Sequence, residues 1–493
     1  MLVSTLLIVG FAFNPAQASC AQWDLTGDGT ANVVDVQCHI DLTLAELVGT
    51  RPPACVGPAQ SGDYNQNGSV NVVDTQLLIS GVLSCVDGPA PSEDWTRDIL
   101  HTDLVADIQA MEATATITVA AANTTGASFE VGSLNIDAVW GPDGDLEWQV
   151  VGDRLDVGVT AGEENIIVID YAFDVADPLE GGLLSTGATR TWPTYCGNLF
   201  PCHSDPADGM TWTLDVLGTP RGEKTIYASE VETDAPSYML AWATADFDSY
   251  TFATTDAGTT VEAHLLDAVT PAQQANLEVA ANAFGFYEAV LGDYAFGEIV
   301  GVVEVEYPEP AWLMGMEHHP WWHLAPDLID DIVTMVHEPA HGWYGNGVRI
   351  ACWEDFVLSE GATTYLSAVA LGDMGGANLE ADVWSYYQQA LYFTAEKNTV
   401  VAWPDGCGAI GSVEAELYNG VPYYKGAFFL KAVENEIGRP QLLSALSGFY
   451  QARVGTAATT QEFIDYLEAD TGFDTSALVD TWLKSTGMPA VFP

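Results

Sequence analysis

The feature that most constrains this chain is a pair of histidines, His337 and His341, separated by three residues and preceded by an apolar run. Residues four apart lie on one face of an α-helix, so both imidazoles can reach one metal ion only if this segment is helical. Glu338, between them, points toward the same side and can act on a water molecule held by the metal. The pattern H-E-x-x-H therefore predicts a helix with two zinc ligands and a general base.

A third ligand should follow on a neighbouring helix, because a catalytic zinc ion has three protein ligands and one open position. Glu360 stands nineteen residues after His341, which allows one turn and a second, antiparallel helix. The alternative is two surface histidines on a polar helix face. The apolar residues before the motif, together with Glu360, favour a single zinc site of His337, His341 and Glu360.

The residues around this motif follow the pattern of a known family. The zinc pattern is H-E-x-x-H, eighteen residues and then Glu360, and it is accompanied by Trp343-Tyr344-Gly345-Asn346, Trp353-Glu354-Asp355 and Leu358-Ser359-Glu360-Gly361. Together these resemble the gluzincin aminopeptidases of the aminopeptidase N family, with their W-F-G-N, W-x-D and L-N-E-G motifs. The resemblance implies that His337, His341 and Glu360 bind one zinc ion and that Glu338 is the catalytic base.

Two further motifs extend the resemblance. Residues 315–318, with Glu317, resemble the family's G-A-M-E-N motif, which implies that Glu317 binds the free α-amine of a substrate; a carboxylate suits an ammonium group. Residues 421–426 resemble V-P-Y-E-K-G, which implies that Tyr423 donates a hydrogen bond to the developing oxyanion. Residues 200–207 and 236–241 resemble passages of the family's N-terminal β-domain. The resemblance therefore covers residues 95–493.

Several residues depart from the family pattern and leave alternatives open. Pro339 stands inside the zinc helix, where proline removes a backbone hydrogen bond and favours a kink. His318 replaces Asn, Met314 replaces a Gly, and no large helical domain follows Trp482-Leu483. One alternative is a zinc endopeptidase with an open cleft. Others are a catalytically silent scaffold and a binding protein whose only functional metals are calcium ions.

An internal repeat in residues 20–86 predicts calcium binding. Residues 24–35 are echoed by residues 63–74, with oxygen donors at loop positions 1, 3, 5, 9 and 12 and Gly at position 6. The candidate ligands are Asp24, Thr26, Asp28, Asn32 and Asp35 with the Thr30 carbonyl, then Asp63, Asn65, Asn67, Asn71 and Asp74 with the Ser69 carbonyl. Asp at position 12 resembles dockerin repeats, which implies two structural Ca²⁺ ions and a cohesin-type partner. Asx-rich turns without metal are the alternative.

The charge balance excludes two classes of partner. The chain has 13 Lys and Arg against 69 Asp and Glu, a net charge of −56. Such a surface repels nucleic acid and anionic membranes, so neither is expected to bind. Beyond the N-terminus, no apolar stretch of 18 or more residues free of charge appears, so membrane insertion is not expected either.

The N-terminus and the cysteines point to export. Residues 2–13 are apolar and Ala16-Gln17-Ala18 offers a cleavage site, so residues 1–18 are expected to be a signal peptide of a secreted or cell-surface protein. The chain has 8 cysteines, none in a C-x-x-C pattern. We therefore expect disulfides rather than a cysteine zinc site, with a pairing that the sequence does not define.

The predicted organisation is multidomain α+β. An EF-hand-like dockerin module (residues 20–86) and a linker (87–94) precede a β-sandwich-like domain (95–265), in which Ile166-Ile167-Val168-Ile169 is expected to be buried on both faces. A thermolysin-like α+β catalytic domain (266–493) follows, with helices at 327–345, 355–371, 425–437 and 462–470. Thr270 before Pro271 predicts a further helix start. The predicted activity is hydrolysis of N-terminal residues from peptide substrates.

Overall fold

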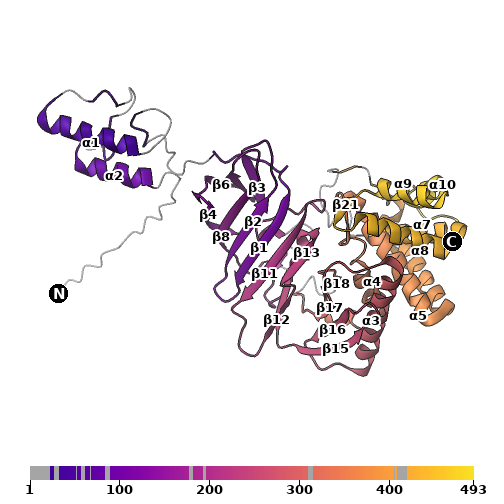
Figure 1. Ribbon diagram of the computed structural model, residues 1–493. Coiled ribbons are helices and arrows are strands. Elements are labelled where there is room, and N and C mark those ends of the chain that lie inside the picture. Colours follow the sequence, from indigo (N-terminus) through magenta and orange to yellow (C-terminus); the bar gives the residue numbers. More distant parts are fainter. Residues whose placement is uncertain are drawn as a thin grey trace. The chain divides into compact units, whose positions relative to one another are not determined.

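The computed structural model describes residues 23–26, 33–50, 53–56, 61–66, 68–83, 89–176, 181–191, 196–308, 315–404, 406–407 and 419–493 (Figure 1). The expected signal peptide lies outside these residues. The chain forms two compact units, one of residues 1–89 with 144–147 and one of the remaining residues. Within the described part of the chain, no helix combines the length and apolar character needed to cross a bilayer.

The N-terminal unit is built from two helices, α1 (Val33–Val48) and α2 (Val72–Leu83), each of which begins inside one of the repeated loops. Leu25, Leu42 and Leu78 are buried between these elements. The buried His39 ties the repeats together, because its ring nitrogens bond to the Gly62 carbonyl at 2.7 Å and to the Thr75 hydroxyl at 3.0 Å. The two repeats therefore form one small helical unit.

The second unit begins with a mixed sheet whose strands run in the order β13-β11-β1-β2-β8-β4. Only β1 and β11 pair in parallel. Alternating burial along β2 shows one face on the core and one toward solvent. These strands are β1 (Ile99–Asp107), β2 (Glu112–Val119), β4 (Asn135–Gly141), β8 (Asn165–Ala172), β11 (Gly209–Leu217) and β13 (Glu230–Pro236).

The expectation for the β-branched run in β8 is wrong. Ile167 and Ile169 are buried, whereas Ile166 is 44% exposed and Val168 is half-buried. The run therefore alternates like its neighbours, because this antiparallel sheet is covered fully on one face only. A continuous apolar run alone does not distinguish these two cases.

Smaller sheets complete the β-region. β3, β7 and β6 form a three-stranded sheet, and β9–β10 and β12–β14 form two-stranded pairs. Their bounds are β3 (Gly126–Glu130), β6 (Trp148–Val151), β7 (Arg154–Gly158), β9 (Gly182–Leu183), β10 (Thr189–Arg190), β12 (Lys224–Tyr227) and β14 (Trp242–Ala245). The two-residue β5 (Gly144–Asp145) follows β4 in the order of the large mixed sheet.

A five-stranded sheet in the order β15-β16-β17-β19-β18 supports the later part of the chain. It spans the boundary expected at residues 265 and 266, because β16 pairs in parallel with β17. The short β18 forms one edge of this sheet. The strands are β15 (Asp248–Thr254), β16 (Thr260–Leu265), β17 (Ile299–Glu304), β18 (Gly315–Met316) and β19 (Trp321–Leu324), with β20 (Val348–Ile350) and β21 (Thr456–Ala458) forming a separate pair.

Helices make up most of the rest of the chain. The predicted helix start at Thr270 is confirmed, and it forms a capping box: the Thr270 side chain accepts from the Gln273 amide, and the Gln273 side chain accepts from the Thr270 amide. The zinc helix is shorter than predicted and the helix of Glu360 is longer, with a break at Gly376. The helices are α3 (Pro271–Leu291), α4 (Ile332–Ala340), α5 (Phe356–Phe393), α7 (Gly420–Ile437), α8 (Arg439–Arg453), α9 (Thr460–Thr471) and α10 (Ser476–Leu478).

Two contacts fix the helices that carry the candidate site. α5 and α7 cross at Gly361 and Gly426, where a Cβ on Gly361 would lie 2.7 Å from the Gly426 Cα. Arg349, on β20, links strand β13 of the β-region to the turn after α8. Its guanidinium donates to the carbonyls of Asp234 on β13 and Gly455 in that turn. Backbones in such close contact hold Glu360 on α5 and Tyr423 on α7 at a fixed separation.

Three disulfides join described cysteines. The pairs are Cys38–Cys55, Cys196–Cys202 and Cys352–Cys407. The expectation of disulfides is therefore confirmed for these six residues, while Cys20 and Cys85 lie outside the described residues. The Cys352–Cys407 disulfide joins residues 55 positions apart, and the helix that carries Glu360 lies between them in the sequence.

Candidate active site

The three predicted zinc ligands converge on one point. His337 Nε2 lies 3.1 Å from His341 Nε2 and 3.1 Å from Glu360 Oε2, and His341 Nε2 lies 3.6 Å from the same oxygen. His337 lies in the last turn of α4 and His341 directly follows this helix, whose start Asp331 caps by accepting from the Val333 amide. Two imidazole nitrogens and one carboxylate oxygen this close together form the donor set of a catalytic zinc site.

The orientation of His341 is fixed by a contact at Nδ1, the ring nitrogen that faces away from the other ligands. Its Nδ1 lies 3.1 Å from the Tyr344 carbonyl, an acceptor, so Nδ1 carries the proton and Nε2 presents its lone pair to the metal position. Gly345, with φ of 106°, makes this contact possible, because a Cβ there would lie 2.8 Å from Nδ1 and 2.4 Å from the Ser359 hydroxyl. The Gly of the W-Y-G-N segment is therefore needed to accommodate the ligand.

The charges at this site favour a bound cation. Burial alone would raise the pKa of Glu360, but the neighbouring His341 and His337 lower it to about 2. Burial likewise opposes a charge on His341, but Glu360 and Glu317 outweigh it and raise its pKa to about 10. The buried carboxylates thus favour a positive charge at Nε2 of His341. A bound divalent ion would supply that charge at the same place.

Pro339 does not separate the ligands. α4 continues through it to Ala340, and the amides of His341 and Gly342 then bond three residues back, to Glu338 and Pro339, at 3.3 Å each. The helix therefore tightens after Glu338 and leaves both imidazoles on one face. The Glu338 carbonyl also accepts from His319 Nε2 at 3.0 Å, which holds this turn against the sheet.

Glu338 and Glu317 lie on the same side of the histidines. One carboxylate oxygen of each and a ring nitrogen of His341 all lie within 4.8 Å of one another. Burial, reinforced by Glu317 and Glu360 and opposed by His341, raises the pKa of Glu338 to about 8. Gly315 on β18 allows this approach, because a Cβ there would lie 2.6 Å from Glu338 Oε1. The position is that of a proton acceptor beside a metal-held water.

Glu317 is held by residues from both parts of the second unit. Its backbone carbonyl accepts from Asn346 Nδ2 at 2.8 Å, and Tyr238 donates to Asn346 Oδ1 at 2.7 Å. Burial raises the pKa of the Glu317 carboxylate, although the neighbouring His341 opposes this shift. Glu317 thus combines a buried carboxylate with a rigid backbone at the end of the site.

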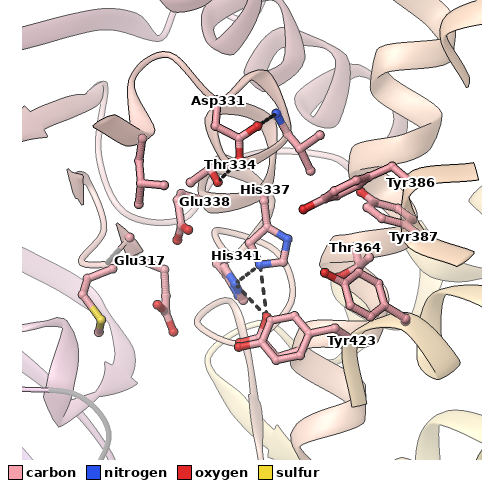
Figure 2. A pocket seen from close by; sticks show the side chains of 16 residues that line it. Glu317, Asp331, Thr334, His337, Glu338, His341, Thr364, Tyr386, Tyr387 and Tyr423 are labelled. Atoms are coloured by element: carbon pink, nitrogen blue, oxygen red, sulfur yellow. Dashed lines mark hydrogen bonds and ion pairs between the residues drawn. The ribbon is translucent and has the colours of Figure 1, made fainter. Parts of the chain in front are cut away.

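Tyr423 approaches from α7. Its ring stacks on His337 with centroids 6.1 Å apart and an angle of 22° between planes, and it meets Phe356 edge-on at 5.8 Å. The predicted ligands, base, amine-binding residue and tyrosine therefore all surround one cavity of about 250 Å³ (Figure 2).

Several residues that line the same cavity were not predicted from the sequence. Tyr386 and Tyr387 lie on α5, well beyond Glu360, and Tyr424 follows the predicted tyrosine on α7. Asp331 and Thr364 also line the cavity. Asp331 carried a usable signal, an acidic residue directly before an apolar helix. The tyrosines carried none, because twenty-five or more residues separate them from Glu360.

Of the neighbouring histidines, His319 has a structural role. His319 Nδ1 accepts from the Tyr294 hydroxyl at 2.7 Å, and burial lowers the pKa of His319 to about 3. His318 and His323 are both buried, with ring centroids 4.9 Å apart. Neither belongs to a group of three ligand-type side chains among the described residues.

The repeated loops bring their acidic residues inward. Asp35 Oδ1 accepts from the Thr26 amide at 2.8 Å, and Asp74 Oδ1 accepts from the Asn65 amide at 3.1 Å, the same contact at equivalent loop positions. Asp24 is buried as well. Of the predicted calcium ligands, the structure describes Asp24, Thr26, Asp35, Asp63, Asn65, Ser69, Asn71 and Asp74, while Asp28, Thr30, Asn32 and Asn67 lie outside the described residues.

Comparison with known proteins agrees with this geometry. Residues 328–482 match the model of the Peptidase family M1 domain. Leucine aminopeptidase 2-1 of Meyerozyma guilliermondii is 26% identical over 345 residues, which cover 64% of this chain and 54% of that protein. Leucine aminopeptidase 2 of Aspergillus niger is 26% identical over 335 residues, covering 60% and 52%. The chain therefore spans about half the length of these relatives.

Solved structures show the same fold. An M1 zinc metallopeptidase of Deinococcus radiodurans, in a variant bound to the substrate Tyr-Ser-Ala, superposes with a TM-score of 0.66 at 17% identity and covers 80% of this chain and 95% of that one. Yeast LTA4 hydrolase superposes with a TM-score of 0.66 at 18% identity, covering 80% and 69%. The second unit thus has the fold of M1 zinc metallopeptidases.

Proposed function

We propose that this protein is a zinc-dependent aminopeptidase that removes N-terminal residues from peptides. The observation that carries the proposal is the buried Glu317 carboxylate, within 4.8 Å of Glu338 and His341. A peptide whose free α-amine meets Glu317 has its first peptide bond beside the metal position. The names of the two leucine aminopeptidase relatives support the same activity.

His337, His341 and Glu360 would hold the zinc ion. Their chemistry fits it, because two imidazole nitrogens and one carboxylate oxygen converge within 4.8 Å. When bound, zinc supplies a Lewis acid that polarises the scissile carbonyl and acidifies a water molecule. The Tyr344 carbonyl and Ser359 keep His341 in the required orientation.

Glu338 would transfer the proton, and Tyr423 would stabilise the oxyanion. Glu338 takes the proton of the attacking water at its carboxylate and passes it to the leaving amine, a role that fits its place beside His341 and Glu317. Tyr423, stacked on His337, donates its hydroxyl hydrogen to the oxygen that gains charge from the scissile carbonyl. Glu317 meanwhile holds the substrate's ammonium group in register.

Metal content and hydrolysis of amino-acyl fluorophores test this proposal together. We expect one zinc per purified chain, and release of the fluorophore that stops on addition of a chelator and returns with zinc. A folded protein without zinc and without hydrolysis of any amino-acyl substrate would contradict the proposal and favour the silent scaffold.

We also propose that the N-terminal unit is a calcium-stabilised dockerin-like module that binds a cohesin-type partner. The equivalent contacts made by Asp35 and Asp74 in the two loops support it, because position 12 of such a loop is a metal ligand. We expect the helical signal of an isolated 20–86 fragment to increase on addition of calcium. An identical spectrum in calcium and in chelator would contradict the calcium part.

Finally, we propose that the protein is secreted or displayed at the cell surface. The three disulfides support this localisation, because such bonds persist in oxidising compartments. Mass spectrometry of the protein recovered from culture medium should find a mature N-terminus near residue 19. Recovery only from the cytoplasm, with reduced cysteines, would contradict it.

A further inference from the structure

The cavity has two ends with different chemistry. Glu317 lies on one side of the imidazoles of His337 and His341, and Tyr386, Tyr387 and Thr364 lie on the other (Figure 2). If the α-amine of a substrate binds to Glu317, the chain runs past the metal position toward the second side. The side chain of the second residue, which leaves with the product, must therefore enter the space beside the tyrosines.

Three tyrosine rings form the walls of this space. Tyr387 and Tyr424 lie with ring centroids 5.5 Å apart, and Tyr386 is next to Tyr387 at 5.8 Å. Tyr386 is 50% exposed at the mouth, whereas Tyr387 is 1% exposed. Aromatic faces of this kind attract flat cationic groups such as a guanidinium.

Two buried hydroxyls in this space lack a protein partner. Tyr387 Oη and Thr364 Oγ1 are enclosed, and neither makes a hydrogen bond within the described part of the structure. Both residues line the cavity and are at least 97% buried. A buried hydroxyl without a partner costs free energy, so these groups are suited to bond with a ligand that brings several N–H donors.

Asp331 adds a negative charge to the same space. Its carboxylate caps α4, where Oδ1 accepts from the Val333 amide at 3.1 Å and Oδ2 accepts from the Thr334 hydroxyl at 2.8 Å. A carboxylate has about four acceptor positions, so two remain for a ligand. Among the described residues that line the cavity there is no Lys or Arg, so none of these side chains neutralises Asp331.

We propose that this side of the cavity selects peptides with a basic second residue, arginine above all. Its guanidinium stacks on Tyr386 and Tyr424, donates to Asp331, and reaches the hydroxyls of Tyr387 and Thr364. Five N–H donors in one plane match this set of acceptors, whereas an aliphatic side chain leaves them all without a partner. The inference rests on the proposed aminopeptidase activity and adds a substrate class to it.

A set of three tripeptides tests the inference: Leu-Arg-Gly, Leu-citrulline-Gly and Leu-Leu-Gly, with release of free leucine measured by chromatography. Citrulline has nearly the shape of arginine without its charge. We expect kcat/KM for the arginine peptide to exceed that for the citrulline peptide about tenfold, the size of one charge-assisted hydrogen bond. Equal values for these two peptides would overturn the inference, while no cleavage of any of the three would instead contradict the proposed function.

Asp331→Asn and Asp330→Asn make a matched pair of variants. Asparagine keeps the cap on α4 but removes the charge at Asp331, so we expect the arginine-to-citrulline ratio to fall toward one. Asp330 is exposed and does not line the cavity, so removing its charge should leave the ratio as in the wild type. If the arginine-to-citrulline ratio of kcat/KM falls equally in both variants, the general negative charge of the protein gives the preference, and the inference about Asp331 is overturned.

Discussion

The Tyr238 hydroxyl donates a 2.7 Å hydrogen bond to Asn346 Oδ1, and Asn346 in turn donates from Nδ2 to the Glu317 carbonyl at 2.8 Å. Tyr238 comes from the β-region and Asn346 from the turn after the zinc helix. All three residues are buried. The residue proposed to bind the amine is thus positioned by a chain of contacts that begins in a different part of the fold.

Removing that hydroxyl should weaken recognition of the amine. In Tyr238→Phe the loss of a buried hydrogen bond of about 1 kcal/mol is expected to raise KM for free-amine substrates about fivefold, with a smaller change in kcat. Tyr450→Phe is the control, because its hydroxyl donates a part-buried hydrogen bond to the Asp293 carbonyl, a contact that involves neither Asn346 nor Glu317. A similar KM increase in both variants would contradict a specific role for Tyr238.

Glu338→Gln should separate catalysis from metal binding. Glutamine cannot accept the proton, so kcat is expected to fall by a factor of about 10²–10⁴. Zinc content should stay at the wild-type level, because the three metal ligands are unchanged. Elemental analysis and initial rates on the same preparation check both parts, and near-normal turnover would rule out Glu338 as the base.

The crossing of α5 and α7 should not tolerate even one added methyl group. In Gly361→Ala the new Cβ would meet the Gly426 backbone, so we expect a loss of about 1–3 kcal/mol in stability together with lower activity. Gly285→Ala on α3 is the control. Its Cβ has no neighbour nearer than 3.5 Å, and better helix propensity should make it neutral or stabilising by about 0.5–1 kcal/mol. Thermal melts distinguish the two, and equal shifts would contradict the packing argument.

A buried ion pair in the β-region should make stability depend on pH. Both ring nitrogens of His203 face acceptors, Asp208 at Nδ1 and the Ser128 carbonyl at Nε2. Burial alone would lower the pKa of His203, but Asp208 outweighs it and raises this pKa in the folded state. A raised folded-state pKa gives stability that is complete below the unfolded value near 6.5 and is lost as pH rises through the folded value.

His203→Gln should therefore lower the melting temperature more at pH 6 than at pH 9, by about 2 °C or more. His101→Gln serves as the control, because its partner Asp103 is half exposed and such surface pairs contribute little. A difference between wild type and His203→Gln that stays constant across this pH range would contradict a charged His203.

The sequence could predict the parts of the site that lie within one helix or one short motif. His337 and His341 follow from helical spacing, and the cap at Thr270 follows from local side-chain chemistry. Ile166 was mispredicted because burial of a strand face depends on what packs against the sheet. Tyr386 and Tyr387 could not be predicted, since only the crossing of α5 with α7 and the break at Gly376 bring them to the metal position.

Paired substrates that differ only at the N-terminus test the proposed activity most directly. Wild-type protein is given a peptide with a free α-amine and the same peptide acetylated, and cleavage of the first bond is followed by mass spectrometry. With Glu317 binding the ammonium group, the free peptide should be cleaved at least a hundredfold faster, since acetylation leaves a buried carboxylate without its partner. Comparable cleavage of both peptides would contradict an aminopeptidase and indicate the open-cleft endopeptidase.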